Sequence, residues 1–523
     1  KALDGVVALV LDELHVVDDT ARGDQLLLLV ERLRARAKVQ VLAASATVPD
    51  PAALAARYLH EGAVVSAPGK RRVVAHIEPS RSPVALSRRL FEFAEAGLRK
   101  VLVFCDKRDE VEILVRALRG RAPFGSAVFA HHGSMAKNAR LATEAQFLAA
   151  PTAVCVATGT MELGIDIGNI DLVVLNGPPP DLPSLLQRIG RGGRRADGVH
   201  VLCLANGVFQ AAIFRTLLAT QRDGGWHHER PTFRAGVLVQ QAISSLHERP
   251  SRTIDAAALH RRLPAWLRDE WPVERLETVL ARMVERDWLS RPANGRYGLG
   301  GKAEALWARG RLHANIEDSA GVAVVDSLTG DTVGHVADAS IPAVNLAGRA
   351  RRVVVASDKR VVTESTGAWD LPNFGGGPPR PTNPALATAL LTGATIPVPS
   401  LCRLGDGVAF FHGLGTAGGL LAAAVLKAAG AKVIRAGRFA VLLDTVPQNW
   451  PRPESVAGAL ASAHPAMARE LDLGAWHKQL PATVQREVVG ERARVDLVEA
   501  AFLLRPPEAA VADEELWNDA AWA

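Results

Sequence analysis

Short apolar runs alternate with helical patterns between residues 80 and 204, and this alternation restricts the fold of the chain more than any other feature. The apolar runs have the length of single strands and lie at 100–105, 127–131, 152–157, 172–176 and 200–204. Buried strands separated by helices are typical of a parallel sheet with helices on both faces. We therefore predict a complete, doubly wound α/β domain over residues 79–225.

The first residues predict part of another α/β domain, over residues 1–78. Val6–Leu11 is a continuous apolar run that ends in acids, and a helical pattern and a second strand pattern follow it. Ligands bind at the carboxyl ends of parallel strands. The acid pair Asp12-Glu13 follows the first strand pattern and Ser45-Ala46-Thr47 follows the second, so both motifs are expected at a ligand-binding edge.

Length and composition limit the class of protein. A chain of 523 residues exceeds the size of one hydrophobic core, so several domains are expected. The sequence contains no uninterrupted apolar stretch of membrane-spanning length, and its four cysteines form no Cys-x-x-Cys pair. These features favour a cytoplasmic protein without a membrane span. The formal charge of +6 permits a polyanionic partner without requiring one.

The segments after residue 225 predict three further domains. Residues 226–305 have the outline of a winged helix, residues 306–382 that of a small β-barrel and a linker, and residues 383–523 that of a C-terminal accessory α/β domain. The third helical pattern of the winged helix places three arginines on one face. These arginines, with Arg296 in the following hairpin, are either a solvated surface or nucleic-acid contacts; they are Arg275, Arg282 and Arg286.

Four short motifs carry side chains suited to a nucleotide and to nucleic acid. Asp12 would hold Mg²⁺ through water, and Glu13 would orient a water that attacks a γ-phosphate. Ser45 and Thr47 are placed to hydrogen-bond this acid box, although caps of local turns are the favoured explanation of both motifs when each is taken singly. Residues 157–167 place hydroxyls and a carboxylate at the end of a strand. Residues 187–194 combine arginines, which suit phosphate oxygens, with glycines that let the backbone approach a ligand.

Taken together and in order, the motifs resemble motifs II to VI of superfamily 2 helicases. The resemblance rests on Asp12-Glu13-Leu14-His15, Ser45-Ala46-Thr47, strand 101–105 with Asp106-Lys107-Arg108, His132-Gly133-Ser134, residues 157–167 and residues 187–194. It implies RecA-like folds for residues 1–78 and 79–225, with ATP and Mg²⁺ as cofactors.

The resemblance also implies a role for each motif residue. Asp12 and Glu13 would serve Mg²⁺ and hydrolysis, and Arg191 and Arg194 would reach the γ-phosphate as arginine fingers. Arg188 is expected to be a structural or coupling contact. Contacts to the nucleic-acid backbone fall to Thr158 and Gly133. ATP-binding and coupling contacts fall to His15, Ser45, Thr47, Gly164, Asp166 and Gln187, with Asp166 near the ribose.

The order of the predicted domains is similar to that of the large helicase-related (Lhr) family. Members of that family are ATP-dependent DNA helicases that move 3′ to 5′ and are linked to DNA repair. The resemblance therefore implies single-stranded or tailed duplex DNA as the partner, with RNA as the alternative. Leu14 stands where valine is commoner, which is a conservative difference.

One motif of such helicases is absent from the sequence. No Gly-x-x-x-x-Gly-Lys-Ser/Thr segment occurs, and the nearest match, Ala67-Pro68-Gly69-Lys70, follows the acid pair and lacks the leading glycine. The chain thus resembles a helicase cut before motif II, and alone it is expected to bind ATP poorly and hydrolyse it negligibly. A non-catalytic nucleic-acid-binding module is the alternative function.

A third function class rests on the segment Gly413-Leu414-Gly415-Thr416-Ala417-Gly418. This Gly-x-Gly-x-x-Gly pattern stands between a strand pattern and a helical pattern, as a dinucleotide site requires. Arg435, in place of the usual acid, fits the 2′-phosphate of NADP. A tight turn with close helix packing is the other explanation. An NADP-binding oxidoreductase is disfavoured because no hydride-transfer site accompanies the segment.

Overall fold

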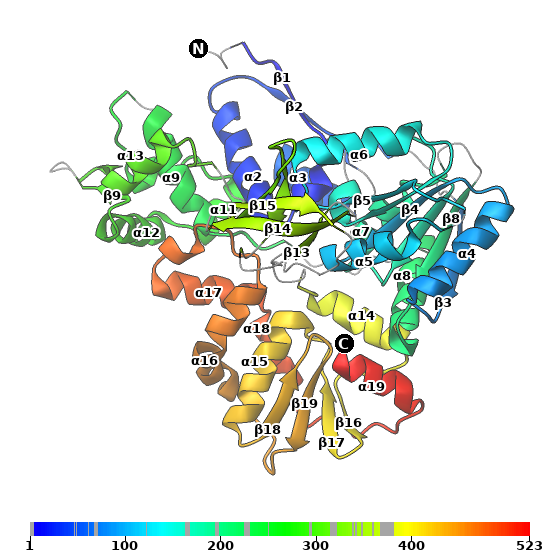
Figure 1. Ribbon diagram of the computed structural model, residues 1–523. Coiled ribbons are helices and arrows are strands. Elements are labelled where there is room, and N and C mark those ends of the chain that lie inside the picture. The colour runs from blue at the N-terminus through cyan, green and yellow to red at the C-terminus, as the bar shows by residue number, and fades with distance from the viewer. Residues whose placement is uncertain are drawn as a thin grey trace.

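The structure is a computed structural model that describes residues 5–45, 48, 50–60, 62–66, 72–121, 123–162, 168–193, 198–223, 231–248, 250–291, 295–313, 322–336, 339, 343–346, 349–357, 360–366 and 381–523. We name its parts the first α/β unit (5–66), the second α/β unit (72–223), the helical unit (231–313), the central sheet (322–366) and the C-terminal unit (381–523). In the view of Figure 1 the helical unit lies on the left, the second α/β unit on the right and the C-terminal unit below both.

The first α/β unit contains the parallel strands β1 (Ala8–Leu11) and β2 (Gln40–Ala43) and the helices α1 (Leu14–Val17), α2 (Ala21–Arg34) and α3 (Pro51–Leu59). Helix α2 begins at a cap, because the Thr20 side chain accepts a hydrogen bond from the Gly23 amide at 3.2 Å. Leu27 and Tyr58 are fully buried in the core of this unit. Because β1 and β2 are parallel, their carboxyl ends lie at the same edge of the sheet, as the sequence predicts.

The second α/β unit is a six-stranded parallel sheet in the order β3-β8-β7-β4-β6-β5. Residues of β4 alternate between two hydrophobic cores: Leu102 and Phe104 enter one, and Val101 and Val103 enter the other. Both faces of the sheet are thus covered, which confirms the predicted doubly wound fold. The strands are β3 (Arg72–Glu78), β4 (Lys100–Cys105), β5 (Val128–His131), β6 (Ala153–Ala157), β7 (Leu172–Asn176) and β8 (Gly198–Leu204), and the helices are α4 (Pro83–Glu95), α5 (Arg108–Leu118), α6 (Lys137–Ala149), α7 (Leu182–Ile189) and α8 (Val208–Asp223).

The helical unit contains the three predicted helices and a short hairpin. Helix α12 buries Leu276, Val279, Leu280 and Met283, the residues with the apolar 3,4 spacing. Two short helices, α11 (Ala265–Glu270) and α13 (Gly301–Ala308), have no predicted counterpart, and the winged-helix assignment stays a prediction. The other elements are α9 (Gly236–Glu248), α10 (Ala256–His260), α12 (Val273–Glu285), β9 (Leu289–Ser290) and β10 (Gly298–Leu299).

The central sheet has five strands in the order β12-β11-β15-β14-β13. Within the described residues its edge strands β12 and β13 do not pair with each other, so the predicted barrel closure is not confirmed. Strand β12 instead pairs with the second α/β unit, where the His335 amide donates to the Ser134 carbonyl at 2.8 Å. The predicted linker 375–381 lies mostly outside the described residues. The strands are β11 (Val322–Asp326), β12 (Thr332–Val336), β13 (Ala343–Leu346), β14 (Arg349–Ser357) and β15 (Arg360–Ser365).

The C-terminal unit is a four-stranded antiparallel sheet, in the order β16-β17-β19-β18, with six helices among the described residues. It packs against the second α/β unit, where the Phe209 and Phe439 rings lie 5.1 Å apart, and against the helical unit, where the Trp288 and Trp476 rings lie 5.0 Å apart. The C-terminal unit therefore joins these two units. Its elements are α14 (Pro384–Gly393), β16 (Ser400–Leu404), β17 (Gly407–Phe411), α15 (Gly415–Ala428), β18 (Lys432–Ala436), β19 (Ala440–Thr445), α16 (Glu454–Glu470), α17 (Ala482–Arg492), α18 (Val495–Ala501) and α19 (Glu514–Trp522). In the described part of the chain, no helix has the length and apolar character needed to cross a membrane.

Candidate functional site

The acid pair lies in solvent at the carboxyl end of β1. Asp12 and Glu13 are both exposed, and the Asp12 Oδ1 atom accepts a hydrogen bond from the Glu13 amide at 2.9 Å. Glu13 has a φ of 51°, in the left-handed region that is costly for a residue with a side chain, and it directly precedes α1. The backbone therefore turns sharply between strand and helix and leaves both carboxylates open to a ligand.

His15 and Ser45 connect the acid box to the end of the second strand. The Ser45 hydroxyl lies 3.0 Å from His15 Nδ1 and accepts a hydrogen bond from the His15 amide at 3.3 Å. Burial lowers the pKa of His15, although the nearby Glu13 and Asp12 carboxylates oppose the change, so the imidazole is neutral at pH 7. Ser45 thus contacts His15, two residues after the acid pair, and its coupling role stays a prediction. Thr47 lies outside the described residues.

The glycines of motif 187–194 form the turn that follows α7. A Cβ atom on Gly192 would lie 2.8 Å from the Val199 side chain, and one on Gly193 would lie 2.5 Å from the Gly198 carbonyl oxygen. Gly193 also has a φ of 63°. The glycines therefore let the turn approach its own sheet, although their pattern predicts an approach to a ligand. Arg194 lies outside the described residues.

Glu162 binds both described arginines of this motif. Its Oε1 atom accepts a hydrogen bond from Arg188 Nε at 2.8 Å, and its backbone carbonyl accepts bonds from Arg191 Nε, at 3.1 Å, and from Arg191 Nη2. Arg188 is 5 % exposed and also donates to Asp106 Oδ1 at 3.1 Å. These contacts fit the structural role expected of Arg188. Gln187 is half-buried on α7.

Glu162 has a role that the sequence does not predict. Its only signal was that it is a carboxylate inside the motif 157–167. In the structure it holds one arginine through its side chain and another through its carbonyl. Its partners are about 26 to 29 residues away in the sequence, so no local pattern indicates this pairing. Gly164 and Asp166, which belong to the same motif, lie outside the described residues.

The residues expected to touch nucleic acid in the second α/β unit lie at the adjacent ends of β5 and β6. The Thr158 amide donates to the His131 carbonyl at 3.1 Å. The His131 ring lies between Thr160 Oγ1, 2.8 Å from Nδ1, and Glu144 Oε1, 2.8 Å from Nε2. Thr158 is half-buried and Gly133 is exposed. The buried histidine thus orders the loop that carries Thr158.

Three of the four arginines predicted to contact nucleic acid in the helical unit have acidic partners within the protein. Arg275 donates to Glu487 Oε2 at 2.6 Å, Arg282 donates to Glu285 Oε2 at 2.6 Å, and Arg296 lies 3.8 Å from Asp255 Oδ2. Arg286 follows the last residue of α12 and is half-buried. Exposed ion pairs of this kind contribute little stability, so phosphates can compete with the carboxylates. The nucleic-acid role of these arginines stays a prediction.

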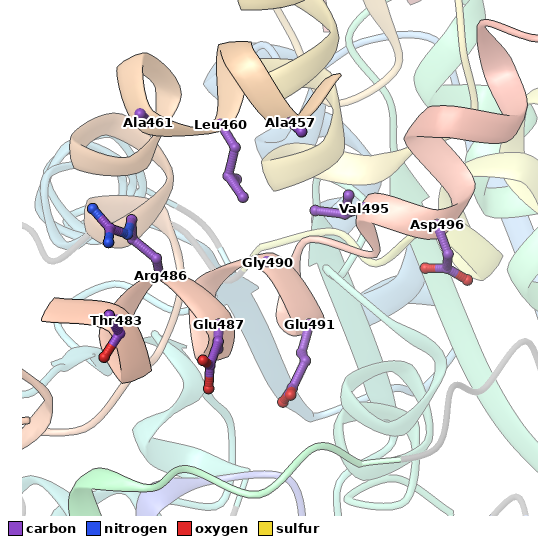
Figure 2. A pocket seen from close by; sticks show the side chains of 10 residues that line it. All are labelled: Ala457, Leu460, Ala461, Thr483, Arg486, Glu487, Gly490, Glu491, Val495 and Asp496. Carbon is purple, nitrogen blue, oxygen red and sulfur yellow. The ribbon is translucent and has the colours of Figure 1, made fainter. Parts of the chain in front are cut away.

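A pocket of about 700 Å³ lies in the C-terminal unit between α16, α17 and α18. Figure 2 shows the apolar side chains of Leu460 and Val495 facing this space, with Glu487 and Glu491 extending from α17. None of its lining residues belongs to the motifs of the two α/β units. The pocket is therefore separate from the candidate site.

The acid pair suits Mg²⁺ better than it suits a metal ion whose ligands are all protein side chains. Among the described residues, no group of three or more His, Cys, Asp and Glu side chains is arranged to hold a metal ion. Mg²⁺ needs no such group, because it keeps several waters and binds through one or two carboxylates and substrate phosphates. The exposed Asp12 carboxylate can supply a ligand of this kind.

The Gly-x-Gly-x-x-Gly segment is not a dinucleotide site. Strand β17, which precedes it, is antiparallel to both of its neighbours, whereas a dinucleotide site needs a parallel βαβ unit. The chain itself fills the loop: the Thr416 amide donates to the Thr382 carbonyl at 2.9 Å, and a Cβ on Gly415 would lie 2.2 Å from that oxygen. The NADP hypothesis is therefore wrong, and these glycines serve close packing.

We expect the protein to lose stability in acid because of His412, which lies next to this loop. Its Nδ1 atom accepts a hydrogen bond from the Leu414 amide at 2.9 Å and its Nε2 atom donates to the Gly437 carbonyl at 3.2 Å, so the ring is neutral. Burial lowers the pKa of His412 from 6.5 to about 4. Because the unfolded chain takes up the proton first, the free energy of unfolding contributed by His412 falls as the pH drops below 6.5, by about 2 kcal/mol at pH 5.

Urea unfolding of the wild type and of His412→Gln at pH 7 and pH 5 checks this prediction. The wild type is expected to lose more stability than the variant on acidification, because glutamine does not titrate. Equal losses in the two proteins would contradict the prediction.

Two family models match the motif-bearing segments. The DEAD/DEAH box helicase family matches residues 1–54, which include the acid pair and Ser45. The helicase conserved C-terminal domain matches residues 85–196, which include Glu162 and the arginine motif. The two matches cover separate units, in the order that the resemblance implied.

Curated relatives are similar to this chain over part of its length. The ATP-dependent helicase Lhr-Core protein 2 of Thermococcus barophilus is 31% identical over 216 residues, which cover 37% of this chain and 25% of that protein. The ATP-dependent helicase Lhr-Core of Methanocaldococcus jannaschii is 30% identical over 211 residues, which cover 37% of this chain and 24% of that protein. The matched region thus spans about a quarter of each relative.

Solved structures extend the likeness to the whole fold. The Mycobacterium smegmatis helicase Lhr bound to ssDNA and AMP-PNP matches 98% of this chain and 80% of its own, with a TM-score of 0.64 at 16% identity. The DUF1998 helicase MrfA bound to DNA and AMPPNP matches 89% of this chain and 72% of its own, with a TM-score of 0.56 at 15% identity. Residues 1–54 and 85–196 therefore match the DEAD/DEAH box helicase family and the helicase conserved C-terminal domain, and the chain shares its fold with the solved helicases Lhr and MrfA.

Proposed function

We propose that this chain belongs to an ATP-dependent helicase that moves 3′ to 5′ along single-stranded DNA, separates duplex DNA and serves DNA repair. The observation that carries the proposal is the distribution of the motifs over the two α/β units. Exposed carboxylates stand at the edge of one parallel sheet, and the glycine and arginine turn stands on the other unit. Lhr-Core relatives named as ATP-dependent helicases support it.

Within this proposal the first α/β unit serves hydrolysis. When bound, ATP with Mg²⁺ supplies the γ-phosphate to be hydrolysed and a positive charge that attracts the carboxylates of the acid pair. Asp12 would hold the metal through water, and Glu13 would orient the attacking water and take its proton. The neutral His15 and the Ser45 hydroxyl connect these carboxylates to the end of β2. Thr47 joins them in this coupling role.

The second α/β unit supplies charge from the opposite side. Arg191 and Arg194 stabilise negative charge on the γ-phosphate, while Asp166 approaches the ribose and Gln187 and Gly164 line the nucleotide. Arg191 reaches the phosphate by exchanging its hydrogen bonds to the neutral Glu162 carbonyl for bonds to charged oxygens. A phosphate oxygen carries negative charge and the carbonyl oxygen does not, so the exchange adds an attraction between opposite charges to the hydrogen bond.

Single-stranded or tailed duplex DNA is the proposed partner, with RNA as the alternative. Thr158 and Gly133 contact the backbone of the tracking strand, and the helical unit adds phosphate contacts through Arg275, Arg282, Arg286 and Arg296. The two solved neighbours are bound to ssDNA and to DNA, which supports this partner. Phosphate contacts position a strand without reading its sequence.

A second candidate function is a non-catalytic nucleic-acid-binding module. The observation that favours it is the absence of a Gly-x-x-x-x-Gly-Lys-Ser/Thr segment from the 523 residues. Backbone amides of that loop cradle the phosphates of the nucleotide, and its lysine reaches the β- and γ-phosphates. As a module of this kind, the chain would bind nucleic acid without hydrolysing ATP.

ATP hydrolysis in the presence of single-stranded DNA separates the two functions. We compare the 523-residue chain with an extended form in which a phosphate-binding loop segment precedes residue 1. Both are expected to bind DNA, and only the extended form is expected to hydrolyse ATP. DNA binding without hydrolysis in either form would favour the binding module, and a lack of DNA binding in both would overturn the helicase proposal.

A further inference from the structure

A cluster of charged side chains joins three units and includes two carboxylates from the segment that follows α1. Arg234, which precedes α9, and Asp24, on α2, are its most buried members, at 1% and 0% exposure. The first α/β unit contributes carboxylates from the segment that follows α1, and the C-terminal unit contributes one acid and one arginine. We call this group the charge cluster; its members are Asp18, Asp19, Asp24, Arg57, Arg234, Asp472 and Arg492.

Arg234 is the centre of the charge cluster. Its Nη1 atom lies 3.2 Å from Asp24 Oδ2 and 3.4 Å from Asp19 Oδ1, and its Nε atom donates to the Asp472 carbonyl at 2.8 Å. Its Nη2 atom donates to the Asp19 carbonyl. All three guanidinium nitrogens therefore bind acceptors, and these acceptors belong to two units other than the one that carries Arg234.

Neighbouring charges make the cluster interdependent. Arg57 Nη2 donates to Asp24 Oδ1 at 2.6 Å, and Arg492 Nη1 lies 3.3 Å from Asp19 Oδ1. Burial raises the pKa of Asp24, while Arg234 and Arg57 oppose the rise. An unpaired buried charge costs several kcal/mol, so the members of such a cluster keep their geometry together.

Helix α1 connects the charge cluster to the acid pair. The Asp18 amide donates to the Leu14 carbonyl at 3.0 Å, and the Thr20 amide donates to the Val17 carbonyl at 3.1 Å. A Cβ on Gly23 would lie 2.2 Å from the Val17 carbonyl oxygen, so α1 and α2 are in close contact. Helix α1 has four residues and begins directly after Glu13. A shift of Asp19 therefore reaches Glu13 through a short, tightly packed segment.

We propose that Arg234 is a positioning residue for the acid pair and transmits the binding of nucleic acid on the helical unit to Asp12 and Glu13. The inference rests on the proposed function and names a route by which DNA stimulates hydrolysis. The coupling element is the pairing of Arg234 with Asp19 and Asp24, since it joins the helical unit to the segment that follows the acid pair.

The test uses Arg234→Gln and Arg234→Lys, with Arg32→Gln as the matched control. Arg32 is 9% exposed and also joins the first α/β unit to the helical unit, because it pairs with Glu248 and donates to Ser244 at 3.0 Å. Within the described residues, its hydrogen-bond and ion-pair partners are Glu248, Gln241 and Ser244, and none of them lies in the segment that follows α1. Its replacement therefore weakens the same interface without disturbing the proposed route.

Hydrogen exchange of the amides at residues 12–18, with and without oligothymidylate, is measured on the 523-residue chain. DNA is expected to slow exchange by about tenfold in the wild type, in Arg32→Gln and in Arg234→Lys. In Arg234→Gln the slowing is lost although DNA affinity stays within about twofold. In the extended form, Arg234→Gln lowers kcat for DNA-stimulated hydrolysis by about tenfold with little change in KM for ATP.

The outcomes separate the inference from the proposed function. The inference would be overturned if DNA still slowed exchange in Arg234→Gln. It would also be overturned if the slowing were lost in both Arg234→Gln and Arg32→Gln. Either result would leave the helicase proposal intact. A wild type that binds no DNA would overturn both. Retention by Arg234→Lys shows that the charge, and not only the packing of Arg234, carries the effect.

Discussion

Glu13→Gln is expected to lower DNA-stimulated ATP hydrolysis by about a hundredfold or more in the extended form. The amide has nearly the same shape as the carboxylate but takes no proton from the attacking water. Glu13 is exposed, and its Oε2 atom lies 3.5 Å from His15 Nδ1. Glutamine keeps a polar amide at this place, so the fold is expected to tolerate the change. Turnover is measured at saturating ATP and single-stranded DNA.

Two controls accompany Glu13→Gln. Binding of a non-hydrolysable ATP analogue is expected to persist, since the change leaves the metal ligand Asp12 in place. Glu95→Gln removes an exposed carboxylate from α4 and is expected to leave turnover unchanged. A fall of less than about tenfold in the Glu13 variant would contradict its role as the base.

Arg188→Met is expected to destabilise the second α/β unit by about 3–5 kcal/mol. Methionine replaces much of the aliphatic volume but leaves the Glu162 carboxylate, which is 8% exposed, without its buried partner. The Arg188 side chain also lies over the Phe104 ring, 5.6 Å from its centroid, so part of its packing is lost. The Glu162 carbonyl also holds Arg191, so we expect the loss to loosen that arginine as well.

The free energy of unfolding of the second α/β unit is measured by urea-dependent hydrogen exchange of the β4 and β6 amides. These amides report on that unit alone, although the chain has several units. Arg222→Met is the control, because the Arg222–Asp223 pair on α8 is exposed, at 75% and 58%. Exposed pairs contribute little, so this variant is expected to leave exchange unchanged. If Arg188→Met stayed within about 1 kcal/mol of the wild type, Glu162 would not depend on Arg188 for its burial.

The fold of the second α/β unit was predictable because its signal is local. Each apolar run has the length of one strand, and the alternation with helices specifies a covered parallel sheet. The central sheet was harder, since its edge strand β12 pairs with a loop of another unit about 200 residues earlier in the chain. Short helices such as α11 lack enough residues for a clear period.

The candidate site was predictable where a motif stands at the end of a strand. Asp12, His15 and Ser45 follow β1 and β2, and parallel pairing alone brings their backbones to one edge. Glu162 and Arg234 were missed because their partners are distant in sequence and no local spacing indicates them. The Gly-x-Gly-x-x-Gly segment gave a wrong prediction for the opposite reason. Its local pattern matches a dinucleotide site, but the strand before it lies in an antiparallel sheet, which the pattern does not indicate.

By itself, the sequence determined the parallel α/β units, the order of the helicase motifs and the residues that stand at the strand ends. Those features depend on hydrophobic periodicity and on motif spacing, which are properties of neighbouring residues. Only the tertiary structure decided which charges pair between units, such as Arg234 with Asp19 and Asp24. A buried ion pair forms where packing brings two distant segments together and excludes water, and the sequence of neither segment contains that information.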